Sequence, residues 1–270
     1  NLGTAIVVAA IFEASGALIA GGDVVSTIKQ GIIEPSLIKD GDTFIWLMMS
    51  GLLAGAIWLN IATALGAPVS TTHTIVGGVL GAGLAAGGTD IANWDQVFAI
   101  TAGWIFTPVV GGLIAAGFLY LIKRHITYQV DMIGAAKEIV PILVVGMAWA
   151  FCSYLLLKGL NKIYAINFFS AIIFGALFAA VLYLLIKPTI SKVANKLPNE
   201  KNSVNSLFTV PLILAAALLS FAHGANDVAN AVGPLAAIHE TIKSGHIAQQ
   251  AHIPIWIMVV GALGICLGLI

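Results

Sequence analysis

The sequence predicts an all-α fold, a polytopic transmembrane helical bundle, from three observations. Hydrophobic residues make up 59% of the 270 residues and charged residues only 9%, whereas an ordinary soluble domain has about 25% charged residues. The mean hydropathy is +1.01. The apolar residues form repeated blocks of about 20 residues, the helical length that crosses a hydrocarbon core of about 30 Å. We therefore expect a multi-pass integral membrane protein of the plasma (inner) membrane, with no cofactor and no basic patch for nucleic acid.

Eight helical segments follow one another, and nearly all charged residues lie between them. The expected helices are 2–21, 44–65, 71–87, 94–122, 138–157, 164–186, 207–238 and 254–270. Pro68 ends the second segment, and Ser70 to Thr72 offer caps for the start of the third. The segments are too long and too evenly apolar for barrel strands, and helices satisfy their own backbone polar groups in lipid. The loops 123–137 and 187–201 hold most of the lysine and arginine residues, so we assign both to the cytoplasm.

The first and last apolar segments share a rhythm of small and apolar residues. The stretches AIVVAAIFEASGALIAG and IWIMVVGALGICLG place Gly16 against Gly268. If every segment spans the bilayer, these two run in opposite directions, which indicates the inverted-topology repeats of a transporter. The GxxxG spacings at 77–81 and 83–87 allow close helix contact, either within the bundle or between the protomers of a homodimer.

A first motif, FAHGANDVANAVGP, lies between two apolar runs near the end of the sequence. Gly224, Asn226, Asp227 and Asn230 are expected to interrupt a spanning helix at mid-membrane. A charged side chain at that depth costs about 2.5 to 3.5 kcal/mol on insertion scales and therefore indicates a functional site. The alternative is that the span ends at Ala222 and that Asp227 caps a separate helix at the membrane interface.

A second motif, GAPVSTTHTIVGG, gathers polar groups at one helix N-terminus. Pro68 stops the preceding helix, and the hydroxyls of Ser70, Thr71 and Thr72 lie beside free backbone N–H groups. Such N–H groups and the positive end of the helix dipole suit phosphate or carboxylate without a basic side chain. The alternative is an ordinary capped loop at the membrane surface.

Glu13 is a third feature, because its neighbours are apolar for a full helical turn on either side. A carboxyl group in such surroundings must face a partner, a cation or water. The alternative is a protonated glutamic acid that is hydrogen-bonded to a neighbouring helix.

These two motifs and the IFEASGA segment resemble the inorganic phosphate transporter family often called PiT, the sodium- or proton-coupled phosphate permeases. The resemblance implies two inverted halves with one copy of both motifs in each, whereas this sequence has a single copy of each. We therefore expect a central part of a longer transporter, with a GANDVANA copy within about 30 residues before Asn1 and a PVSTTH copy after Ile270. The implied division is 1–122 for the remainder of the first repeat, 123–206 for connecting helices and a cytoplasmic loop, and 207–270 for the start of the second repeat.

The resemblance implies a secondary active transporter, not an enzyme, that imports inorganic phosphate together with a cation. No lysine or arginine lies deep in an expected helix, so hydroxyls, amides and helix N-termini must hold the anion. The expected phosphate-binding residues are Ser70, Thr71, Thr72 and Asn226. The expected cation-binding residues are Asp227, Asn226, Asn230 and Glu13. Na+ is favoured as the coupling ion because these oxygens offer more ligands than a proton needs, and a proton on Asp227 and Glu13 stays the alternative.

Two other classes of function fit parts of the sequence. A cation channel or a cation-only carrier would use Asp227 and Glu13, but it leaves the hydroxyl-rich helix end without a role. An intramembrane hydrolase would use His73 or His223 as a metal ligand or base. Neither histidine has a second histidine at ligand spacing on the same helix, which argues against the hydrolase.

Overall fold

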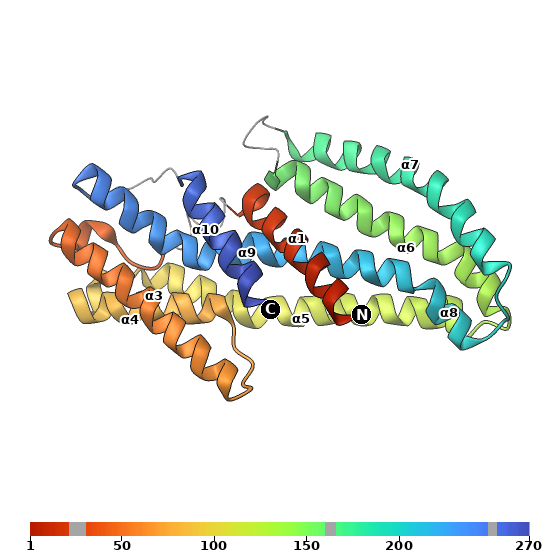
Figure 1. Ribbon diagram of the computed structural model, residues 1–270, viewed down its shortest axis with the longest axis horizontal. Helices are drawn as coiled ribbons and strands as arrows, with labels where there is room; N and C mark the ends of the chain where they lie inside the picture. The colour runs from red at the N-terminus through yellow and green to blue at the C-terminus, as the bar shows by residue number, and fades with distance from the viewer. Residues whose placement is uncertain (22–30, 160–165, 248–252, 270) are drawn as a thin grey trace. The chain divides into compact units, whose positions relative to one another are not determined.

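The computed structural model describes residues 1–21, 31–159, 166–247 and 253–269, and these residues are mainly helical (Figure 1). The α-helices within these ranges are α1 Leu2–Ala20, α3 Gly41–Ala64, α4 Thr71–Gly87, α5 Trp94–Ile122, α6 Met132–Tyr154, α7 Phe168–Ala194, α8 Lys201–Leu207, α9 Thr209–Ser244 and α10 Ile255–Gly268. Short 3-10 turns lie at Pro35–Leu37 (η1) and Thr89–Ile91 (η2), and π-helical turns extend α5 over Lys123–Thr127 (η3) and α6 over Leu155–Gly159 (η4).

Six helices in the described ranges are long and apolar enough to cross a membrane, namely α1, α3, α5, α6, α7 and α9. This result confirms the expected all-α membrane fold and the expected multi-pass insertion. Polar side chains mark where the helices begin. Asn1, Asp40, Ser70, Asp131 and Asn167 each accept a hydrogen bond from the backbone N–H three residues further on.

Several helices extend further than expected. The bounds of α4 and α5 match the expected ones, but α7 continues to Ala194 and α9 to Ser244. The connections expected at 187–201 and 239–252 are therefore partly helical. The reason is that lysine and glutamate favour helices in water as much as apolar residues do, so charge marks the end of the hydrocarbon core and not the end of the helix.

The interruption expected in α9 is wrong. The helix runs from Thr209 to Ser244 as one element, through Gly224 and Asn230. The alternative of a span ending at Ala222, with Asp227 as the cap of a new helix, is also excluded. The polar residues here bond to neighbouring helices through their side chains, so the backbone of α9 keeps its own helical hydrogen bonds.

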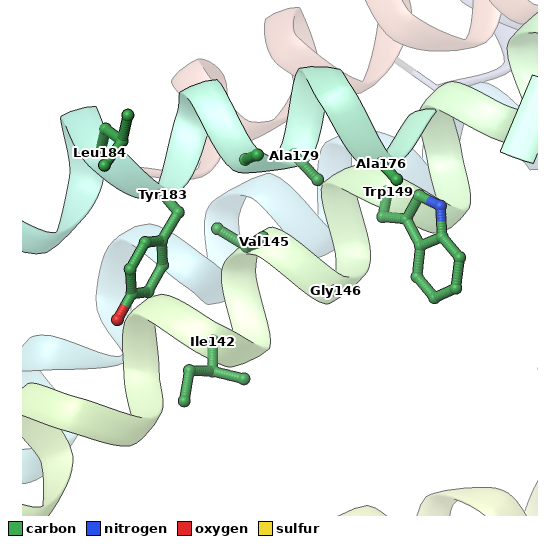
Figure 2. A pocket seen from close by; sticks show the side chains of 9 residues that line it. Ile142, Val145, Gly146, Trp149, Ala176, Ala179, Tyr183 and Leu184 are labelled. Carbon is green, nitrogen blue, oxygen red and sulfur yellow. The ribbon is translucent and has the colours of Figure 1, made fainter. Parts of the chain in front are cut away.

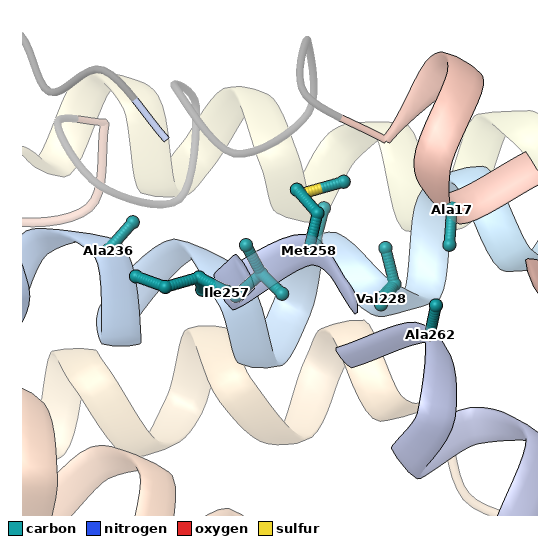
Figure 3. Packing of buried hydrophobic residues seen from close by; sticks show 8 residues of the cluster. Ala17, Val228, Ala236, Ile257, Met258 and Ala262 are labelled. Carbon is teal, nitrogen blue, oxygen red and sulfur yellow. The ribbon is translucent and has the colours of Figure 1, made fainter. Parts of the chain in front are cut away.

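The described residues divide into two compact units. Unit 1 contains residues 1–103 and 220–270. In this unit α1 and α10 lie side by side and pack on α9 (Figure 3). Their shared buried cluster consists of Ala17, Val228, Ala229, Val232, Ala236, Ile257, Met258 and Ala262.

Helices α3 and α4 of unit 1 form a hairpin that is packed through small residues. A Cβ atom at Gly78 would lie 2.7 Å from the carbonyl oxygen of Gly51. Of the two GxxxG spacings, 83–87 packs against isoleucine side chains, whereas a Cβ at either end of 77–81 would meet nothing within 4 Å. The expected homodimer stays a prediction.

Unit 2 contains residues 104–219. Its main feature is the antiparallel pair α6 and α7, with α8 packed against both helices at one end (Figure 1). The buried cluster at that end consists of Ile126, Ile133, Ala136, Val140, Val144, Ala194, Val204 and Leu207. The division into repeat remainders at 122 and 206 concerns internal sequence similarity, and it stays a prediction.

Candidate functional site

The loop between α3 and α4 shapes one side of the site in unit 1. Gly66 turns the chain with a φ of +67°, and Pro68 prevents α3 from continuing. Ser70 then caps α4, accepting a hydrogen bond from the backbone N–H of His73 at 3.3 Å. Thr71 and Thr72 follow as half-buried residues of the first turn. The expected cluster of hydroxyls at a helix N-terminus is therefore confirmed.

Helix α9 brings its polar residues to this helix end. The Thr71 hydroxyl donates to Asp227 Oδ2 at 2.6 Å. The amide of Asn230 donates to Thr71 Oγ1 at 3.3 Å and to Thr72 Oγ1 at 3.1 Å. Asn226 is exposed, and its amide donates to Asp227 Oδ1 at 3.2 Å. The two motifs, about 150 residues apart in the chain, thus form one hydrogen-bonded network.

Helix α1 adds Glu13, which is only 5% exposed. Its Oε1 atom lies 3.2 Å from His223 Nδ1, and His223 Nε2 lies 3.0 Å from Asp227 Oδ2. Glu13 therefore has a hydrogen-bond partner on a neighbouring helix, namely His223 on α9. The sequence reasoning missed His223 as the link. His223 and Asp227 are four residues apart, so their side chains lie on one face of a helix. This spacing is the sequence signal that could have identified His223.

His223 thus lies between two carboxyl groups, Glu13 on α1 and Asp227 one turn further along α9.

Two buried oxygen atoms of the site have no hydrogen-bond partner among the described residues. They are Glu13 Oε2 and Asn230 Oδ1, and Asn230 is only 3% exposed. Buried polar atoms almost always have a partner, and an unpaired one indicates a bound ion or water. Both are hard oxygen atoms in a site that also holds the Asp227 carboxyl group, and hard oxygen atoms are the ligands that suit a cation such as Na+.

The helices reach this geometry by a close crossing of α1 and α9. A Cβ atom at Gly16 would overlap the carbonyl oxygen of Phe221, and one at Gly224 would overlap the carbonyl oxygen of Glu13. The crossing therefore requires glycine on both helices. It is what brings Glu13 within hydrogen-bond distance of His223.

Ionisable side chains enclosed by spanning helices, next to a helix N-terminus, define a membrane protein of the transporter class. The sequence model of the Phosphate transporter family, PHO4, matches residues 1–270. The chain belongs to this family, which consists of transporters and not of enzymes. Its resemblance to phosphate permeases is therefore confirmed.

Known relatives extend this result. The chain is 50% identical over 272 residues to a Helicobacter pylori protein named "Putative phosphate permease", covering 100% of this chain and 51% of that protein. A relative with the same kind of name from Pyrococcus horikoshii is 32% identical over 266 residues, covering 98% of this chain and 64% of the relative. A solved structure named "The sodium-dependent phosphate transporter" matches with a TM-score of 0.92 at 30% identity, over 99% of this chain and 66% of that chain. The chain thus spans about half to two thirds of the length of these relatives.

Proposed function

We propose that this chain forms the core of a secondary transporter that imports inorganic phosphate with a coupling cation, Na+ in preference to H+. The observation that carries the proposal is the bond from Thr71 to Asp227. It joins the helix end suited to an anion directly to the carboxylate suited to a cation. A cation channel or cation-only carrier would not need this connection.

The proposed phosphate site is the N-terminus of α4. The first backbone N–H groups of a helix have no partner inside the helix, and they point along the positive end of its dipole. The hydroxyls of Ser70, Thr71 and Thr72 lie there, and Asn226 adds an exposed amide. These donors can replace part of the hydration shell of phosphate without a basic side chain.

The proposed cation site lies among Asp227, Asn226, Asn230 and Glu13. The carboxyl groups of Glu13 and Asp227 both contact His223, and the unpaired oxygens of Glu13 and Asn230 add ligands. A bare Asp227 carboxylate would repel phosphate, because two anions this close repel each other strongly where water is scarce. A cation bound beside Asp227 removes this repulsion, so each ligand raises the affinity for the other by the same factor.

Sodium is the favoured cation for two reasons. The site offers several hard oxygen atoms, whereas a proton needs a single acceptor. A protein whose structure matches this chain over 99% of its residues is named a sodium-dependent transporter. We further propose that α1 and α10, which lie side by side on α9, are copies of one element in two inverted repeats.

Uptake of radioactive phosphate into liposomes containing the intact protein tests the proposal. We expect uptake to rise with an inward Na+ gradient and to fall to background when choline replaces Na+. Asp227→Asn should abolish the Na+-stimulated part, whereas the matched control Asp90→Asn, an exposed residue of η2, should not. Uptake by Asp227→Asn at the unmutated rate would remove Asp227 from the coupling site.

Protection against thermal unfolding separates the proposal from a cation-only carrier. Na+ and phosphate together should raise the unfolding temperature more than the sum of their separate effects, because the two ligands stabilise each other. Protection by Na+ with no effect of phosphate would support a channel or a cation-only carrier instead. Thr71→Ala should weaken phosphate protection more than Na+ protection, and it should lower both because Thr71 donates to Asp227.

A further inference from the structure

Unit 2 contains an apolar groove that the proposed transport site does not use. The groove has a volume of about 610 Å³ and lies between α6 and α7 (Figure 2). From α6 it is lined by Ile142, Val145, Gly146 and Trp149, and from α7 by Ala176, Ala179, Ala180, Tyr183 and Leu184. On each helix these positions are three or four residues apart, so they form one continuous stripe.

The shape of the groove suits a single flexible hydrocarbon chain. Its middle is lined by Val145 and Gly146 on α6 and by alanines on α7, with Trp149 towards one end and Tyr183 towards the other (Figure 2). The stripes extend over about 10 to 12 Å along the helices at 1.5 Å per residue.

An ion pair lies one helical turn beyond the Tyr183 end of the groove. Lys187 Nζ is 2.9 Å from Glu138 Oε2, and Lys187 also lies over the Tyr183 ring at 5.4 Å from its centroid. Glu138 and Ile142 are four residues apart, as are Lys187 and Tyr183, so each charge stands directly above the groove on its own helix. The Lys187 and Glu138 side chains are 37% and 60% exposed.

We infer that this groove binds a phosphatidylethanolamine lipid, with an acyl chain between α6 and α7 and the headgroup on Lys187 and Glu138. The mouth presents one positive and one negative group side by side, which complements a zwitterionic headgroup. The lipid phosphate accepts from Lys187, and the lipid ammonium donates to Glu138. An exposed ion pair contributes little by itself, so exchanging its partners for the two ends of the headgroup costs little.

The charges also distinguish among membrane lipids. Phosphatidylglycerol has no ammonium group and would place its net negative charge near Glu138. Phosphatidylcholine carries a quaternary ammonium without N–H donors, so it cannot hydrogen-bond to the Glu138 carboxylate. We therefore expect the groove to bind phosphatidylethanolamine most strongly, phosphatidylcholine less strongly and phosphatidylglycerol least.

Native mass spectrometry of the intact protein in detergent tests this inference, with dioleoyl forms of the three lipids added in equal amounts. We expect one phosphatidylethanolamine to be retained preferentially, and Glu138→Gln to lower its preference over phosphatidylglycerol about three- to fivefold, as for a partly exposed charge interaction. Gly146→Leu should abolish retention, because a side chain at Gly146 meets nothing within 4 Å and fills the groove. The matched control Gly117→Leu, on α5 and equally open, should retain the lipid.

Three results would overturn the inference. They are equal retention by the Gly146→Leu and Gly117→Leu variants, retention of phosphatidylglycerol as strong as that of phosphatidylethanolamine, and a protein dimer that Gly146→Leu separates. If a variant does not fold, the retention of the three lipids by the unmutated protein still tests the expected order of headgroups. None of these measurements depends on phosphate uptake, so their failure leaves the transport proposal untouched.

Discussion

The crossing of α1 and α9 gives the sharpest test of the packing that builds the site. In Gly224→Ala the new methyl group overlaps the backbone carbonyl of Glu13. A backbone atom cannot turn aside as a side chain can, so the two helices must separate by about 1 Å to restore van der Waals contact. Overpacking of this kind costs about 1 to 3 kcal/mol.

The separation also breaks a hydrogen bond. The contact between Glu13 and His223 is 3.2 Å long, and it would exceed hydrogen-bond distance after such a shift. A hydrogen bond to a charged group contributes about 1.5 to 3 kcal/mol. We therefore expect Gly224→Ala to lose about 2.5 to 6 kcal/mol of stability in all, which lowers the unfolding temperature by roughly 10 °C.

Thermal unfolding of the intact protein in detergent, followed by tryptophan fluorescence, measures this loss. Gly77→Ala is the matched control, because its Cβ meets nothing within 4 Å and alanine favours a helix over glycine. The control should therefore keep or raise the unfolding temperature. Gly16→Ala should also be destabilising. The double variant should lose less stability than the two single variants added together, because one separation of α1 and α9 makes room for both methyl groups. An unfolding temperature of Gly224→Ala equal to that of the unmutated protein would refute the reasoning.

Three further predictions concern single polar residues. The backbone N–H of Thr43, and after it the Thr43 hydroxyl, hold the pKa of the Asp40 carboxyl below its ordinary value. Since the folded pKa is lowered, the cap stabilises α3 fully above the ordinary pKa of about 3.9 and is lost as the pH falls through the folded pKa. The hydrogen-exchange protection of the first turn of α3 should fall over that range, and Asp40→Asn should remove this pH dependence. Ser70→Ala should cost about 1 kcal/mol by loss of the α4 cap and weaken protection by phosphate, whereas Ser70→Asn should restore the stability in a thermal melt. Asn230→Leu removes the donor to two threonine hydroxyls, so it should lower the unfolding temperature and abolish protection by Na+; full protection would exclude Asn230 from the cation site.

Local signals were sufficient where one residue decides an element. Pro68 and Ser70 end one helix and begin the next, and both bounds of α4 follow from such signals. The same reasoning wrongly predicted a helix break at residues 224–230. Glycine and asparagine occur both where a helix is interrupted and where an intact helix packs closely against another, and the local sequence does not distinguish the two cases. What distinguishes the two cases is the presence of Gly16 and Thr71 on other helices, which no local window contains.

The site was predictable as a set of residue types but not as a network. Each expected site residue was chosen because its own chemistry was unusual for a membrane segment. His223 was set aside because it had no second histidine nearby, although its actual partners are carboxylates on α1 and α9. Partners on another helix depend on which faces meet, and a single sequence does not contain that information.

The network changes how coupling between the two ligands is explained. Separate anion and cation sites would interact only through space, and their coupling would depend on distance alone. In the proposed sites the Thr71 hydroxyl would belong to both, because it lies at the N-terminus of α4 and donates its proton to Asp227. We propose that a cation drawing the Asp227 carboxylate towards itself weakens that bond and frees the hydroxyl proton for phosphate. On this proposal the cation neutralises the carboxylate and also makes the Thr71 hydroxyl available as a donor to the anion.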